Sequence, residues 1–207
     1  MQTRHIPRAT LSLLTAEIPL RTERLLLRPW RATDRKPFAA INADPQVMEW
    51  FQGPLTAAQS DAFVDWIEQR FREQGWGYWA VEIAGGEPFI GFVGLSPADK
   101  TLGYPSVEIG WRLVAARWGH GYAPEAAREA LRFGFDDLGL NEMVSFTSVG
   151  NAKSRRVMTK IGMTRTPEDD FNHPRVPKAS PLARHVLYRI KRAAFAAGGA
   201  ARPNSGE

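Results

Sequence analysis

The segment VEIGWRLVAARWGHGYA, residues 107–123, decides the fold. Its first part, Val107 to Val114, alternates side chains with period two and predicts a strand. A helix is predicted from about Tyr122 to Leu138, because apolar residues recur on one face, Pro124 lies in its first turn and Gly139 follows its end. A strand thus leads directly into a long helix.

Two glycines, Gly119 and Gly121, lie where the strand passes into the helix. Backbone N–H groups there are unobstructed and carry partial positive charge from the helix dipole, so they predict an anion site that suits a diphosphate. A Rossmann loop would need a third glycine where Pro124 stands, and a Walker loop would need Gly-Lys-Ser/Thr. A simpler interpretation, a tight turn with no ligand, stays open.

The rest of the chain predicts an α+β (mixed α/β) plan. A first strand, two helices and an antiparallel meander precede the segment, and a strand, a short helix and a last strand follow it. The expected sheet is mixed and mostly antiparallel, with about six or seven strands flanked by about four helices. The expected strands are 24–30, 77–83, 89–95, 107–114, 143–149 and 185–190. Besides the helix after the glycines, the expected helices are 33–42, one that begins at residue 56, and 151–162. One domain, residues 21–192, would lie between an N-terminal extension, 1–20, and a disordered tail, 193–207.

Composition excludes several kinds of chemistry. The 207 residues include no Cys, which rules out disulfides, zinc thiolates and a cysteine nucleophile. The four histidines show no metal-ligand spacing, so we expect no metal. The apolar run near the N-terminus is too short for a signal peptide or a membrane span, so we expect a cytoplasmic protein that is not membrane-bound.

Basic residues are concentrated in residues 151–192, which hold eleven Lys or Arg against three Asp or Glu. Such a stretch is either a solvated face or the surface that meets an anion. A nucleic-acid partner is the weaker interpretation, because neither a DNA-binding helix pattern nor an aromatic platform accompanies the charges.

The sequence resembles the GNAT superfamily of N-acetyltransferases, in the RimJ/RimL-like branch of ribosomal-protein-alanine acetyltransferases. The match is carried by WGHGYAPEA at 118–126, TERLLLR at 22–28, VEIGW at 107–111 and NAKSRRVM at 151–158. The resemblance covers about residues 21–192 and implies the GNAT fold, acetyl-CoA as cofactor and transfer of an acetyl group to a primary amine.

The resemblance also implies which residues bind the cofactor. In the family, the glycine-loop backbone binds the CoA pyrophosphate, the preceding strand pairs with the pantetheine arm, and a later helix faces that arm. Arg155, Arg156 and Lys153 are candidates to contact the 3′-phosphate, although solvated surface is the default interpretation of each one individually. The implied residues are Leu113, Val114, Ala115, Arg117, Trp118, Gly119, His120, Gly121, Tyr122, Ala123, Asn151, Ser154 and Arg156. Ala116 departs from the Gln or Arg with which the superfamily often begins this loop.

Catalysis needs a base, because an alkylammonium with a pKa near ~10 has no lone pair with which to attack. Glu108 is the candidate base, although an exposed or salt-bridged strand glutamate is the plainer interpretation. Many family members have a tyrosine acid where Met158 stands, so Ser154 or water is left to protonate the departing thiolate. The missing tyrosine keeps a non-catalytic acyl-CoA-binding or regulatory module as the alternative.

The acceptor pocket is the part that the sequence defines least. In the family, the positions of Met48, Trp50 and Phe51, together with the loop 166–184, shape this pocket, but the same residues are equally compatible with core and lid. The acceptor is left open between a small-molecule amine and a protein N-terminus. Both a monomer and a homodimer are compatible with the sequence.

Overall fold

The computed structural model describes residues 19–98 and 107–200, with side chains to residue 198. The expected extension 1–20 lies almost wholly outside the described residues, as do residues 201–207 of the expected tail.

A single nine-stranded sheet runs through the described part of the molecule, in the order β1-β2-β3-β4-β5-β6-β9-β7, with β8 also paired to β9. Every pairing is antiparallel except the parallel one between β5 and β6, which confirms the mixed, mostly antiparallel sheet. Six strands have four or more residues, as expected, and three have two. The strands are β1 (Leu20–Arg21), β2 (Leu25–Arg28), β3 (Tyr78–Ile83), β4 (Gly91–Pro97), β5 (Val107–Leu113), β6 (Glu142–Ser148), β7 (Thr164–Arg165), β8 (Phe171–Asn172) and β9 (Arg184–Lys191).

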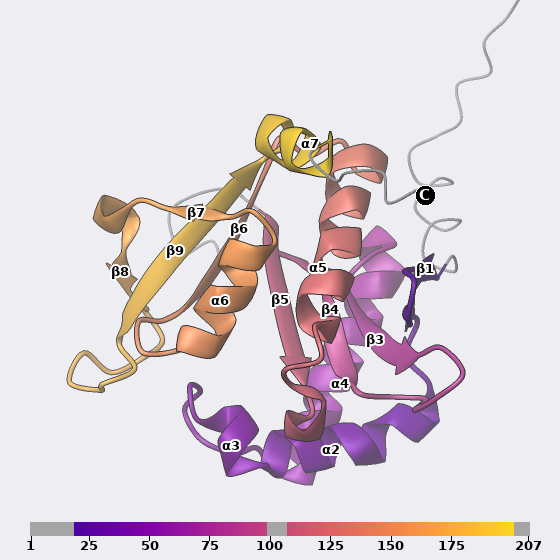
Figure 1. The fold of residues 1–207 in the computed structure, drawn as a ribbon. Helices are drawn as coiled ribbons and strands as arrows, with labels where there is room; N and C mark the ends of the chain where they lie inside the picture. The colour runs from indigo at the N-terminus through magenta and orange to yellow at the C-terminus, as the bar shows by residue number, and fades with distance from the viewer. Residues whose placement is uncertain (1–18, 99–106, 201–207) are drawn as a thin grey trace, which may run out of the picture.

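Helices cover both faces of the sheet (Figure 1). In the view of Figure 1, α5 and α6 lie in front of the sheet and α4 lies behind it. The described residues form six α-helices, more than the four expected. They are α2 (Arg35–Ala43), α3 (Pro45–Met48), α4 (Ala57–Gln74), α5 (Tyr122–Arg132), α6 (Ala152–Lys160) and α7 (Arg192–Ala200), with 3₁₀ turns η1 (Ala32–Asp34), η3 (Ala115–Arg117) and η5 (Pro167–Asp169).

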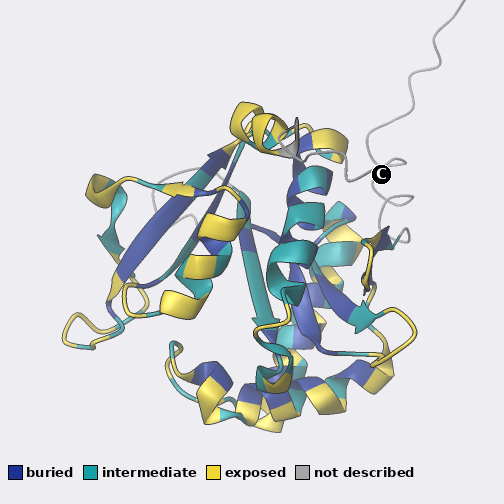
Figure 2. Cartoon of the chain, viewed as in Figure 1, coloured by how far each residue is buried: buried dark blue, intermediate teal, exposed yellow. Residues whose placement is uncertain are grey.

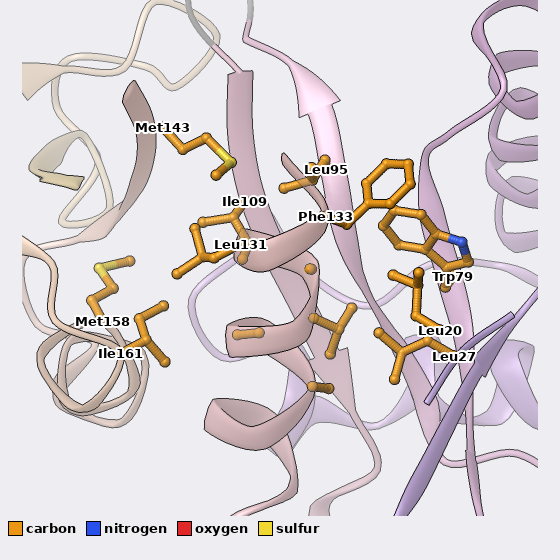
Figure 3. Close-up of a cluster of buried hydrophobic side chains, with 14 of the residues drawn as sticks. Leu20, Leu27, Trp79, Leu95, Ile109, Leu131, Phe133, Met143, Met158 and Ile161 are labelled. Carbon is orange, nitrogen blue, oxygen red and sulfur yellow. The ribbon is translucent and has the colours of Figure 1, made fainter. Parts of the chain in front are cut away.

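The core divides into two clusters, one on each side of the sheet, because strand residues alternate between its faces. On the α5 side, Trp79, Ile109 and Leu131 are buried together, and Met158 of α6 belongs to the same cluster (Figure 3). On the α2 and α4 side, Phe38, Ile41, Val47, Val64 and Phe92 form a smaller cluster. The strands are accordingly mostly buried, while the helices expose their outer faces (Figure 2).

Local signals explain where α4 begins and ends, and a buried ion pair explains how the first helices are attached. Thr56 caps α4 as predicted, with its hydroxyl accepting from the Gln59 amide while the Gln59 side chain returns to the Thr56 amide. Gly75 ends the same helix in the left-handed conformation, with φ of 81°. Arg28 of β2 forms a buried ion pair with Asp34, whose side chain is 3% exposed, and this pair joins the sheet to the first helices.

Two predictions about helices are wrong in detail. The helix expected to run to Leu138 is α-helical only to Arg132 and continues as a wider π turn, η4 (Phe133–Asp137). Gly134 comes so close to β6 that a Cβ there would lie 2.6 Å from the Met143 sulfur, and the turn buries the aromatic residues on either side of Gly134.

The tail predicted to be disordered from residue 193 is instead helical to Ala200. Alanine has the highest helix propensity, and Phe195 packs against Phe135 with ring centroids 5.2 Å apart. One aromatic contact therefore fastens a segment whose small residues had suggested disorder.

Candidate cofactor loop and acceptor face

The loop between β5 and α5 has the geometry that its glycines predicted. Gly119 and Gly121 adopt φ of 82° and 83°, the left-handed region where a side chain is strained. Gly121 is also the N-cap of α5. Within the described part of the chain, the amides of residues 119–123 donate to no protein acceptor. The loop therefore presents unpaired donors at the positive end of an eleven-residue helix.

A charged clamp fastens this loop to the start of the sheet. Glu125 in the first turn of α5 accepts from the Arg24 Nε (2.7 Å), the Arg24 amide (3.0 Å) and the Thr22 hydroxyl (2.5 Å). Arg24 Nη1 also donates to the His120 carbonyl (3.1 Å). Burial works against ionisation, but the hydrogen bonds from Thr22 and Arg24 hold the pKa of Glu125 below its usual range. Thr22 and Arg24 belong to the motif at 22–28, but no spacing in the sequence relates them to Glu125, about a hundred residues later.

Two loop side chains predicted to bind the cofactor are held by protein partners. Arg117 makes two hydrogen bonds of 2.7 Å to Glu87, so its guanidinium is directed to that carboxylate. Trp118 Nε1 donates to the Leu113 carbonyl (2.9 Å), and the Lys153 ammonium of α6 lies 4.3 Å from the Trp118 ring centroid. The loop is thus braced on both sides, with these two side chains occupied and its backbone amides unpaired.

The sheet divides beside this loop. β5 and β6 pair at only two positions, Val107 with Met143 and Glu108 with Val144, and they diverge beyond that point (Figure 1). The Val114 amide donates to the Ile90 carbonyl (2.9 Å), so it is not available to a cofactor. Successive amides of a strand point to opposite sides, so the Leu113 amide points away from β4 and toward the gap between β5 and β6. Of the three predicted main-chain partners of the pantetheine arm, Leu113 and Ala115 therefore remain as candidates and Val114 does not.

The predicted residues of α6 have mainly structural contacts. Asn151 is the N-cap, accepting from the Ser154 amide (3.1 Å) and donating to the Thr147 hydroxyl (2.9 Å). Met158, at the position of the family's tyrosine, is fully buried in the core. Arg156 is exposed on the outer face of the helix.

Glu108 of β5 lies on the same face of the sheet as Tyr78 of β3, a partly buried tyrosine that sequence reasoning missed. Tyr78, Gly94 and Gly110 lie in one row across β3, β4 and β5. A Cβ at Gly110 would lie 3.4 Å from the Tyr78 hydroxyl, so this glycine makes room for the phenol. Burial, together with the nearby charge of Glu108, raises the pKa of Tyr78, and its hydrogen bond with Ser96 only partly offsets the rise. The phenol stays protonated at neutral pH.

Arg112, two residues beyond Gly110 on the same face, was also missed. Its Nη1 donates to Asn42 Oδ1 (2.5 Å), and its guanidinium carbon lies 4.3 Å from the Phe51 ring centroid. Its Nε is buried without a hydrogen-bond partner. Burial lowers the pKa of Arg112 to about 10, which leaves it charged at neutral pH. The period-two spacing of Glu108, Gly110 and Arg112 was the signal that could have predicted Arg112 on the same face of the strand as the expected base.

The three residues predicted to shape the acceptor pocket separate in the structure. Phe51 is 42% exposed and covers Arg112, whereas Met48 is 3% exposed and belongs to the packed interior. The Trp50 ring is so close to Gly150 that a Cβ there would lie 2.5 Å away, which ties the α3 end to the turn before α6. Of the three, Phe51 alone is well exposed on this face.

The described residues contain no group of three or more His, Cys, Asp or Glu placed to hold a metal ion. None of their helices combines the length and apolarity needed to cross a membrane.

The acetyltransferase (GNAT) domain family matches residues 24–164, which include the glycine loop and both sides of the divided sheet. The chain belongs to this family. An FsC-acetyl coenzyme A-N(2)-transacetylase of Aspergillus fumigatus is 34% identical over 187 residues, covering 86% of this chain and 78% of that protein. The family assignment identifies the protein as an acetyltransferase and disfavours a non-catalytic module.

Solved structures agree with the GNAT fold. A GNAT-family acetyltransferase of Bacillus anthracis has a TM-score of 0.69 at 26% identity, covering 84% of this chain and 98% of that one. RimJ of Mycobacterium smegmatis, solved in complex with CoA-disulfide, has a TM-score of 0.63 at 19% identity, covering 88% and 93%. Similarity at that level of identity shows the fold alone.

Proposed function

We propose that this GNAT protein uses acetyl-CoA to acetylate a primary amine by direct transfer. The observation that carries the proposal is the row of unpaired amides at residues 119–123, held open by two left-handed glycines at the N-terminus of α5. Donors so arranged suit the diphosphate of CoA. The relative from Aspergillus fumigatus, named as an acetyl coenzyme A transacetylase, supports the same cofactor.

The roles of the remaining residues form part of the proposal. Acetyl-CoA, when bound, supplies the acetyl group as an activated thioester. The Leu113 amide faces the divided sheet, where a backbone donor stabilises charge on a thioester oxygen. Glu108 takes the proton from the attacking amine, and Ser154 or a water returns a proton to the leaving thiolate. Residues 21–192 form the catalytic domain of a cytoplasmic protein.

The branch within the family and the acceptor are finer proposals. The quoted motifs favour a RimJ/RimL-like relative, with either a protein N-terminus or a small molecule as acceptor. The shared fold with RimJ is compatible with this placement. Following CoA release on a panel of peptides and small amines distinguishes the two classes of acceptor.

A pair of matched variants tests the cofactor loop. Gly119 and Gly139 both have positive φ, and a Cβ at either position meets nothing within 4 Å. Glutamate at either position introduces the same strain and charge, but only Gly119→Glu places a carboxylate beside the proposed diphosphate site. Calorimetric titration with CoA should show at least about tenfold weaker binding for Gly119→Glu and no change for Gly139→Glu. Equal CoA affinity in the two folded variants would contradict the site.

A further inference from the structure

Arg112 carries a positive charge that its surroundings do not neutralise. The described residues provide it with no carboxylate within ion-pair distance, whereas the buried Arg28 contacts both Asp34 and Glu82. Its neighbours are instead aromatic, since its guanidinium carbon lies within 6.0 Å of four phenylalanine ring centroids: Phe38, Phe51, Phe63 and Phe92. Ring faces stabilise a cation only modestly compared with an anion at hydrogen-bond distance.

The hydrogen bonds of Arg112 leave one edge of the guanidinium unused. Asn42 accepts from Nη1 and is itself held in place, because its Nδ2 donates to the Ser60 hydroxyl at 2.8 Å. No described residue accepts from Nε or Nη2, and only Nε is shielded from solvent. Nε and Nη2 form the side of the guanidinium that binds a carboxylate with two parallel hydrogen bonds. The protein thus fixes Arg112 by one nitrogen and leaves its forked edge unpaired.

The position of Arg112 connects this edge to the proposed chemistry. Arg112 and Glu108 project from the same face of β5, and four residues of strand correspond to about 13 Å between their Cα atoms. Tyr78, with its hydroxyl beside Gly110, lies between them. Phe51, which covers the guanidinium, is 42% exposed in the turn that follows the short helix α3 and is the neighbour best placed to move aside. An acceptor could therefore reach Glu108 with its amine and Arg112 with another group.

We infer that Arg112 binds a carboxylate of the acceptor, so that the substrate is a primary amine that also carries a carboxylate. This inference rests on the proposed function and names its substrate class. The carboxylate supplies the unpaired edge with acceptors and neutralises the charge of a side chain that is only partly exposed to water. The lowered pKa of Arg112 agrees with that surrounding.

The test compares acids with their amides. Linear ω-amino acids from glycine to 8-aminooctanoate are each paired with their primary carboxamides, and CoA release is followed at saturating acetyl-CoA. A hydrogen-bonded charge pair corresponds to a preference of about 10- to 100-fold in kcat/KM for the acid at the best chain length. Arg112→Met should abolish the preference and Arg112→Lys should retain part of it. Arg72→Met, at an exposed position on α4, is the matched control and should keep the preference unchanged.

Calorimetry of the same pairs in the presence of CoA gives a second readout that needs no turnover. Acid and amide acting equally on the wild type in both assays would overturn the inference, as would a preference that survives in Arg112→Met. Loss of turnover with every amine would reject the proposed function, while an Arg112-dependent preference in binding would still support the carboxylate site. The wild-type comparison requires no variant, so misfolding of Arg112→Met does not decide the result.

Discussion

At the scale of single residues, Glu108 and Tyr78 are suited to different proton-transfer roles, Glu108 as a base and Tyr78 as a proton donor. The environment that raises the Tyr78 pKa keeps the phenol protonated, so it can donate but cannot act as the base at neutral pH. Glu108 shares the face of β5 on which the phenol lies and remains the candidate base. The two side chains can therefore be tested separately by conservative substitution.

Glu108→Gln should lower kcat/KM at pH 7 by about 100-fold, because general-base catalysis contributes on that order and glutamine cannot accept the proton. The deficit should shrink as the pH approaches the amine pKa near ~10, where the acceptor loses its proton to solvent. Tyr78→Phe should leave the alkaline part of the wild-type pH profile in place. A Glu108→Gln variant with normal activity at every pH would show that another group, or water, removes the proton.

At the scale of elements, the clamp on α5 links the edge of the sheet to the glycine loop. Thr22 and Arg24 come before β2, yet they hold Glu125 about a hundred residues later, and Arg24 also holds the His120 carbonyl within the loop. We expect Glu125→Gln to lower the free energy of unfolding by about 0.5–1 kcal/mol, since the pair is partly exposed, and to weaken CoA binding severalfold through loss of loop order. Chemical denaturation and calorimetry check the two effects.

The sign of the pH dependence follows from the lowered Glu125 pKa. A carboxyl group whose pKa is lower in the folded state stabilises the protein fully above its unfolded value of about 4.3. That contribution is lost as the pH falls through the folded pKa. The difference in stability between wild type and Glu125→Gln should therefore be constant near pH 7, begin to fall below about pH 4.3 and vanish only when the pH lies below the folded pKa. A difference that does not decrease on acidification below about pH 4 would assign the effect to packing rather than to the charge.

The ion pair between β2 and η1 should be far more costly to break. Arg28 and Asp34 have side chains only 4% and 3% exposed. Arg28→Met should destabilise the fold by about 3–5 kcal/mol, because it leaves the Asp34 carboxylate buried without its partner. The double variant Arg28→Met/Asp34→Leu should recover much of that loss in urea denaturation. Full additivity of the two substitutions would show that the pair is not coupled.

The sequence predicted the position of a helix or turn correctly where a cap or a glycine within a few residues determined it. The capping box at Thr56 and the glycines around α5 are local features, and the structure has α4 and the strand-to-helix glycine turn where they predicted them. The π turn at Gly134 and the docking of α7 through Phe195 depend instead on contacts with distant residues. Arg112 was missed for the same reason, since its partners come from α2, α4 and the end of α3, which no spacing in the sequence relates to β5.

At the scale of the whole molecule, two halves of one sheet meet weakly at the proposed cofactor site. β5 and β6 share only two paired positions, and across the division Lys153 of α6 lies over Trp118 of the loop. A ligand that contacts both the glycine loop and α6 would add non-covalent contacts between the two halves of the sheet, which share only two paired positions. CoA at 100 times its dissociation constant should stabilise the fold by about 2.7 kcal/mol, and part of that effect should appear as local protection.

Hydrogen exchange locates that protection. Added CoA should slow amide exchange at residues 119–123 and, in the same titration, at the first turn of α6, because bound cofactor both accepts from the loop amides and restrains the opposite side of the division. β3 lies three strands from β6 across β4 and β5, and its exchange should change only as much as global stability does. Protection of the loop alone would mean that CoA does not bridge the two halves. Protection spread equally over β3 would mean that the ligand acts through global stability and not through this division of the sheet.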